Sequence, residues 1–270
     1  MASPDRPSRG KEPASPGENP TPGEALVERV FALLSSFDSE NRALPLAGLT
    51  RRTGMPRSTA LRLARQLTDV GALERLDDGR FVIGLRLLEI ASLAPRGHGL
   101  RAVAMPYMED LFHVTGQHVL LAVRDNHQAL LVERLSAHDA APVRFRVGER
   151  MALTTTGVGL VLLANAPVGV QERVLQDFVA GEGDTTIRTP EELRRSLAEI
   201  RRGDYAVARR LDPAAPRTTV AAPVRAREGV VAALSVVAPS PEFDPTAYVP
   251  AGRATARAIS RELRETEAAG

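Results

Sequence analysis

Six arginines gather in one stretch of the chain that carries no acidic residue. They lie between Glu40 and Asp69 and give this stretch a charge of +6, although the whole chain has a net charge of only +2. The planar donors of a guanidinium group bond bidentately to a phosphate or to the O6/N7 edge of guanine. Arginines at this density are therefore suited to contact with a polyanion such as double-stranded DNA.

Two helices that flank a tight turn are predicted to carry these arginines. Residues 44–54 form a short amphipathic segment that ends at Gly54, a residue type that readily adopts the left-handed conformation of a helix C-cap. In the next segment, apolar residues recur at helical spacing on one side: Ala60, Leu63, Ala64, Leu67 and Val70. At about 100° per residue, Ser58, Arg62, Arg65 and Asp69 fall on the opposite side. The second helix thus has separate apolar and polar faces.

A helix before this pair and a hairpin after it complete a familiar pattern. Residues 23–37 show the apolar spacing of an amphipathic helix, and residues 72–84 form two strand-like runs around the turn dipeptide Asp78-Gly79. An arginine-rich helix face is often only solvated. However, a helix, a glycine turn, a basic helix and a hairpin in this order indicate a winged helix-turn-helix that binds DNA.

Composition divides the chain into a tail, two domains and a connection between them. The first 23 residues contain six prolines and no apolar stretch, which predicts a disordered tail rather than a signal peptide. A helical connector follows the hairpin and breaks at Pro95, Gly97 and Gly99. The predicted organisation is a tail (1–23), a winged helix-turn-helix domain (24–84), a linker helix and hinge (85–99) and a second domain (100–266).

The second domain alternates between groups of strands and groups of helices. Strands are predicted at 118–125, 128–135, 142–148, 205–210, 217–225 and 229–237. Helices are predicted at 100–116, 155–165, 168–179, 190–202 and 245–266. Strands, then helices, then strands indicate an α+β domain in which helices pack on a central, largely antiparallel sheet.

The composition excludes several kinds of chemistry. Cysteine is absent and the one lysine, Lys11, lies in the tail, which rules out disulfides, thiolate metal sites and a Schiff-base lysine. His113 and His118 would diverge by about 140° on a helix, so they do not form a metal pair. We expect no cofactor, no metal and no catalytic residue. The longest apolar run, 157–164, is far shorter than the roughly 18 residues of a membrane helix, so we expect a cytoplasmic protein without a membrane partner.

Two other kinds of protein remain open at this point. One is an enzyme fused to a DNA-binding module, although the chain has no Gly-x-Ser-x-Gly elbow, dinucleotide fingerprint or phosphate loop. The other is a small-molecule sensor whose helix-turn-helix serves only protein contacts.

Three stretches resemble the IclR family of bacterial transcription regulators. The segment "LPLAGLTRRTGMPRSTALRLARQLTDVGALERLDDGRFVIGLRLLEIA", 44–91, resembles the winged helix-turn-helix of that family. The segments "VGERMALTTTGVGLVLLA", 147–164, and "RRGDYAVARR" with "TTVAAPVRAREGVVAALSVVAPS", within 201–240, resemble its effector-binding domain. The resemblance implies a homodimer, often paired into a homotetramer, whose GAF-like C-terminal domain binds a small organic molecule and alters binding to a palindromic operator. It favours repression over activation.

By position, the resemblance also implies which residues contact DNA. Arg62 occupies the arginine of a Ser-Thr-x-x-Arg pattern in the second helix and is the leading candidate. The full set of candidates is Arg51, Arg52, Arg57, Ser58, Thr59, Arg62, Arg65 and Arg80. For Arg51, Arg52 and Arg80, contact with phosphate or simple solvation is as plausible as the reading of a base.

Effector-binding positions of the family fall on Gly157, Val158, Ala208, Thr219 and Ser235. Where some members have an acidic residue, this chain has Ala208, which predicts a less polar pocket. Among nearby residues, Thr154, Thr155 and Thr156 offer hydroxyls, although one of them can instead cap the following helix. Arg217 offers a charge for a carboxylate, although arginines on strands more commonly face outward. The effector is expected to be a carboxylate or another catabolic metabolite.

Overall fold

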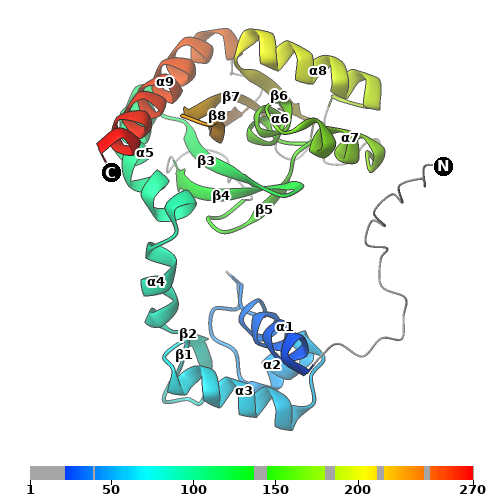
Figure 1. Cartoon of the computed structure of the whole chain (residues 1–270), viewed down its shortest axis with the longest axis vertical. Coiled ribbons are helices and arrows are strands. Elements are labelled where there is room, and N and C mark those ends of the chain that lie inside the picture. The colour runs from blue at the N-terminus through cyan, green and yellow to red at the C-terminus, as the bar shows by residue number, and fades with distance from the viewer. Residues whose placement is uncertain are drawn as a thin grey trace, which may run out of the picture. The chain divides into compact units, whose positions relative to one another are not determined.

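A computed structural model of the chain describes residues 22–38, 40–136, 145–179, 186–211, 216–239 and 244–269. The chain divides into two compact units, Met1–Ala91 and Ser92–Gly270, whose elements are labelled in Figure 1. The predicted tail lies outside the described residues except at its end, where the first helix begins at Pro22.

Three helices, a hairpin and most of a fourth helix form the N-terminal unit. Its elements are α1 (Pro22–Leu34), α2 (Leu46–Thr53), α3 (Arg57–Asp69), β1 (Leu73–Arg75), β2 (Phe81–Ile83) and most of α4 (Leu85–Ser92). Leu33, Leu49, Leu63, Leu73 and Phe81 from these elements meet in one buried cluster. The predicted winged helix-turn-helix is therefore confirmed.

Glycines with positive φ form two of the turns in this unit. Gly54 ends α2 at φ 69° and its N–H donates to the carbonyl of Thr50 at 2.9 Å, which lets the chain turn directly into α3. Gly79 lies at φ 82° in the turn between β1 and β2, which pair antiparallel.

The prediction for Val70 was wrong: α3 ends at Asp69, so Val70 leaves the apolar stripe and is 63% exposed.

One antiparallel sheet covered by helices on both faces forms the C-terminal unit. The elements are a short π-helical turn η1 (Pro95–Gly99), α5 (Leu100–Thr115), β3 (His118–Asp125), β4 (Gln128–Leu135), β5 (Arg150–Ala152), α6 (Gly157–Ala164), α7 (Val168–Gln176), α8 (Pro190–Gly203), β6 (Ala206–Arg210), β7 (Arg217–Ala226), β8 (Gly229–Pro239) and α9 (Pro245–Ala269). The strand order is β5-β4-β3-β8-β7-β6, and every pair is antiparallel. The predicted α+β class with a central antiparallel sheet is confirmed.

The strand predicted at 142–148 was wrong. Residues 142–144 lie outside the described part of the chain, and residues 145–149 form a turn instead. Gly148 adopts φ 86°, and the N–H of Glu149 donates to the carbonyl of Arg146 at 2.9 Å. This turn delays the strand, so that β5 begins at Arg150 and pairs with β4.

Strand alternation sends side chains of the sheet to two separate cores. Val220 and Ala222 of β7 pack with α5 and α9 on one face, whereas Ala221 packs with α6 and α8 on the other. Figure 1 shows α5 and α9 together on one side of this sheet and α6, α7 and α8 on the other. Each face of the sheet thus has its own buried hydrophobic core.

The start of α6 lies directly against β7. Thr156 caps the helix, with its hydroxyl accepting the N–H of Gly159 at 3.0 Å. A Cβ atom on Gly157 would lie 2.6 Å from Cγ2 of Thr219, closer than two carbon atoms can pack. Only glycine at the first position of α6 permits this approach.

We expect Gly157→Ala to lower the free energy of unfolding of the C-terminal unit by about 1 to 3 kcal/mol, because the added methyl group overpacks the contact with Thr219. Gly169→Ala is the matched control, since a Cβ atom there meets nothing within 4 Å. It should instead stabilise α7 by up to about 1 kcal/mol. All three tyrosines of the chain, at 107, 205 and 248, lie in this unit. Tyrosine fluorescence during urea unfolding therefore reports on it alone, and equal effects of the two substitutions would contradict the expectation.

Candidate DNA-binding surface and ligand cavity

Helix α3 buries one side and presents the predicted contact residues on the other. Ala60, Leu63, Ala64 and Leu67 are buried in the N-terminal core. Arg57, Ser58, Arg62 and Arg65 are exposed, and Thr59 is half-buried beside them. The structure therefore brings five of the eight predicted DNA-contacting residues onto one helix surface.

The charges on this surface are largely uncompensated. Nη1 of Arg62 donates to Oε1 of Gln66 one turn further on, at 3.2 Å. Arg57 and Arg65 form no ion pair with any residue that the structure describes. The first turn of α3 has no acidic residue, and Pro56 at its N-cap supplies no capping side chain. Its N-terminal amides are thus available to an anion such as a phosphate.

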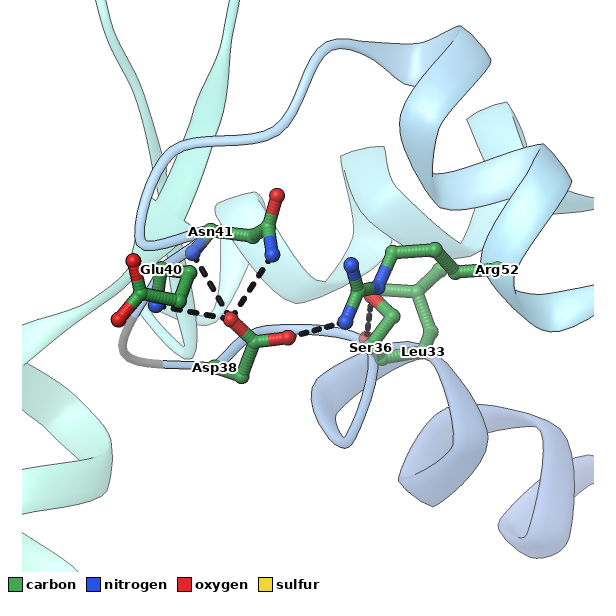
Figure 2. Close-up of polar contacts among 6 residues, drawn as sticks. All are labelled: Leu33, Ser36, Asp38, Glu40, Asn41 and Arg52. Atoms are coloured by element: carbon green, nitrogen blue, oxygen red, sulfur yellow. Dashed lines mark hydrogen bonds and ion pairs between the residues drawn. The ribbon is translucent and has the colours of Figure 1, made fainter. Parts of the chain in front are cut away.

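The remaining three predicted residues lie outside α3. Arg51 is exposed near the end of α2. Arg80, next to the turn of the hairpin, is held by Asp78, with its Nε donating to Oδ2 at 2.6 Å. Arg52 forms an ion pair with Asp38, as Figure 2 shows. Arg52 and Arg80 are therefore engaged within the N-terminal unit, whereas Arg51 is open to solvent.

Asp38 organises the loop between α1 and α2 through one carboxylate. Its Oδ1 accepts the side-chain amide of Asn41 at 2.9 Å and the backbone N–H groups of Asn41 and Glu40 at 2.8 and 2.9 Å (Figure 2). The hydrogen bond from the Asn41 side chain, assisted by these N–H groups and by the charge of Arg52, lowers the pKa of Asp38 against the opposing effect of burial. The ionised carboxylate thereby links this loop to α2.

A cavity opens on the α6 side of the large sheet. Its empty volume is about 540 Å³, including open solvent at the mouth. Six of the seven predicted effector-binding residues line it: Gly157, Val158, Ala208, Arg217, Thr219 and Ser235. They come from the start of α6 and from β6, β7 and β8, which are distant in sequence.

Thr154 is the exception, and its assignment to this cavity was wrong. It lies in the turn between β5 and α6 and lines a separate depression with His127 and Phe178. The next two residues, Thr155 and Thr156, line the cavity instead. Consecutive side chains of a turn point in different directions, so Thr154 lines one depression whereas Thr155 and Thr156 line the other.

Strand register explains why the other residues meet. Ala208 of β6 lies opposite Thr219 of β7, which lies opposite Val237 of β8. In the neighbouring row, Ser235 of β8 lies opposite Leu120 of β3. Residues opposite one another or two apart share a face of a sheet. All these side chains therefore project toward α6.

The polar groups of the cavity are cationic or neutral. Arg217 is only 8% exposed, so it does not face outward. Ser235 is 2% exposed, and its hydroxyl has no hydrogen-bond partner among the described residues. The described lining contains three arginines and no carboxylate. Such a site is suited to a small anion with an apolar body, because apolar side chains supply most of its wall.

Sequence reasoning missed several residues of this wall. Phe145, Met151, Arg209 and Arg210 line the cavity and were not predicted. The signal for Arg210 was present in the sequence, because it follows Ala208 by two residues on one strand. Phe145 had no such signal, since it lies in the turn that was mistaken for a strand.

The described part of the chain contains neither a metal-binding cluster nor a membrane-spanning helix. No group of three or more His, Asp or Glu side chains there is arranged to hold a metal ion. None of its helices combines the length and the apolar character that a membrane span requires.

Comparisons with known proteins agree with both halves of the structure. Residues 26–77 match the model of the IclR helix-turn-helix domain, and residues 94–261 match that of the bacterial transcriptional regulator IclR C-terminal domain. The transcriptional regulator RhmR of Escherichia coli is 31% identical over 185 residues, which cover 68% of this chain and 71% of that protein. The glycerol operon regulatory protein of Streptomyces coelicolor is 29% identical over 247 residues, or 88% of this chain and 95% of that protein.

A solved structure with the same architecture comes from Microbacterium hydrocarbonoxydans. It is an IclR homologue in complex with 4-hydroxybenzoate, with 35% sequence identity and a TM-score of 0.84. The match covers 89% of this chain and 99% of that one. The proteins that the chain matches are transcription regulators, not enzymes. The chain belongs to the IclR family of bacterial transcription regulators.

Proposed function

We propose that this regulator is a ligand-responsive repressor that binds a palindromic operator as a homodimer, or as a homotetramer of two such dimers. The outward face of α3 carries the proposal, because its arginines are exposed directly after the glycine turn of a helix-turn-helix. Each recognition helix would enter the major groove of one half-site. Its DNA partner would place the protein in the bacterial cytoplasm.

The residues of α3 divide between the two kinds of DNA contact. Arg62 lies in the middle of the exposed face, where a long side chain reaches base edges, and we assign it to a guanine. Arg57, Ser58 and Thr59 lie in the first turn, where hydroxyls, guanidinium and backbone amides together suit a phosphate. We assign Arg51 and Arg65 to the phosphate backbone, and Arg80 on the hairpin to the same role after release from Asp78.

The effector is proposed to be a small organic acid. A carboxylate is suited to the amides of Gly157 and Val158 at the start of α6, where the partial positive charge of the helix is directed. Arg217, Thr219 and Ser235 supply further donors from the sheet, beside Ala208. The relative from Microbacterium binds 4-hydroxybenzoate, an aromatic carboxylate, which supports this class of ligand. Binding would favour one arrangement of the paired DNA-binding domains over another.

Exposed apolar side chains on two helices of the N-terminal unit support dimerisation. Val27 and Phe31 lie one turn apart on α1, and Phe31 is 64% exposed. Leu85 and Leu88 are exposed on α4 in the same way. Exposed apolar side chains grouped on a helix in this way often mark a contact with another chain. A second copy of this chain is the partner that a palindromic operator requires.

Arg62→Ala is expected to weaken binding to the specific operator by about 1 to 3 kcal/mol, because a bidentate contact with a guanine is lost. Binding to random DNA should change much less. Arg29→Ala is the matched control, since Arg29 is exposed on α1 and lies outside α2, α3 and the hairpin. Fluorescence anisotropy with a duplex from the protein's own upstream region, and with a scrambled duplex, measures both affinities.

Equal losses on the two duplexes would make Arg62 a phosphate contact and contradict its assignment to a base. The logarithm of wild-type affinity should also fall with the logarithm of salt concentration by about 0.9 per neutralised phosphate. Failure to bind either duplex at low salt would instead favour a helix-turn-helix used for protein contacts.

Phe31→Ala is expected to weaken the dimer about 30-fold, which corresponds to about 2 kcal/mol for an aromatic side chain at the centre of an interface. Val70→Ala is the control, because Val70 is equally exposed in the same unit but lies on neither α1 nor α4. Analytical ultracentrifugation over a range of concentrations gives the dissociation constants. A wild-type monomer at all concentrations, or equal effects of both substitutions, would rule out this interface.

A further inference from the structure

Two arginines lie directly opposite each other at one end of the ligand cavity. Arg210 of β6 pairs with Arg217 of β7, and both side chains line the cavity. An anion bound between the two guanidinium groups would accept charge-assisted hydrogen bonds from both strands.

Arg210 has a buried hydrogen-bond donor that no described residue accepts. It lies at the end of the edge strand and is half-buried, on the same face as Ala206 and Ala208. Its Nε is enclosed by the protein and has no hydrogen-bond partner among the described residues. A buried donor of a charged group without a partner is costly, and charge-assisted bonds to a carboxylate are among the strongest that a guanidinium forms.

The arginine pair is separate from the anion position at the start of α6. Gly157 at that helix start contacts Thr219, and Arg217 lies two residues before Thr219 on the same strand. Two residues of a strand span about 7 Å. Apolar side chains line the same cavity, among them Leu120, Met151 and Val237. The site thus offers two places for negative charge and apolar wall for the body of a ligand.

We propose that Arg210 and Arg217 form a second anion-binding position and that the ligand of this chain is a dicarboxylate with its acid groups at opposite ends of a short apolar body. One carboxylate binds at the start of α6 and the other between the two arginines. Arg210 is then the residue that selects a diacid over a monoacid. This inference rests on the proposed function, because it refines the organic acid proposed as effector.

Paired probes test the inference in the full-length protein. Terephthalate and 4-methylbenzoate share a ring and a first carboxylate, and a smaller methyl group replaces the second carboxylate in the latter; adipate and hexanoate differ in the same way. By isothermal titration calorimetry, the diacid of at least one pair should bind at least tenfold more tightly than its monoacid. Arg210→Met should abolish this preference by weakening diacid binding at least tenfold, while monoacid binding changes less than twofold.

Arg202→Met is the matched control, because Arg202 is exposed on α8 outside the cavity, and it should leave all four affinities unchanged. Monoacids that bind as tightly as diacids, or an Arg210→Met variant that weakens both equally, would overturn the inference and leave the organic-acid effector standing. Failure of all four acids to bind would overturn the carboxylate effector itself and the inference with it. A far-UV circular dichroism spectrum of Arg210→Met that matches the wild type shows that a loss of binding is not a loss of fold.

Discussion

Pairing of β7 with its two neighbours is the interaction on which the ligand cavity depends. The antiparallel register aligns Ala208, Thr219 and Val237 in one row on the face that α6 covers. A slip of one residue would send every one of these side chains to the opposite face, because the side-chain period of a strand is two. The cavity therefore depends on the register of β7, which the hydrophobic pattern of the strands and the turns between them set.

Glycine completes this arrangement by bringing a helix onto the strand. Gly157 lets the first turn of α6 approach Thr219, and Thr156 caps this turn beside the cavity that Gly157 and Val158 line. The start of α6 and the ends of β6 and β7 thus both border the cavity. The N-terminal unit uses glycine differently, since Gly54 reverses the chain so that α3 presents its polar face outward.

Some arginines form ion pairs with carboxylates inside the fold, and others do not. In the C-terminal unit, Arg150 pairs with Asp125 and Arg225 pairs with Asp204, each at 2.6 Å, and these pairs connect elements of the fold. On α3, by contrast, Arg57, Arg62 and Arg65 form no ion pair with any described residue, although Asp69 lies four residues after Arg65. The same contrast holds for Arg210 in the cavity. Among the described residues, the arginines of α3 and Arg210, which are proposed to bind anions from outside the chain, thus lack the ion pairs that hold Arg150 and Arg225 within the fold.

Local sequence determined the elements of this protein and the separation of faces on α3, because helical and strand periodicity, glycine turns and caps act over a few residues. Through resemblance to a known family, the sequence also located five of the fourteen described cavity residues. Tertiary structure alone decided that Arg210 faces Arg217, that Thr154 points away from the cavity, and that Asp38 engages Arg52. These contacts join residues from separate segments or depend on the direction of a turn, and periodicity along one segment carries no information about either.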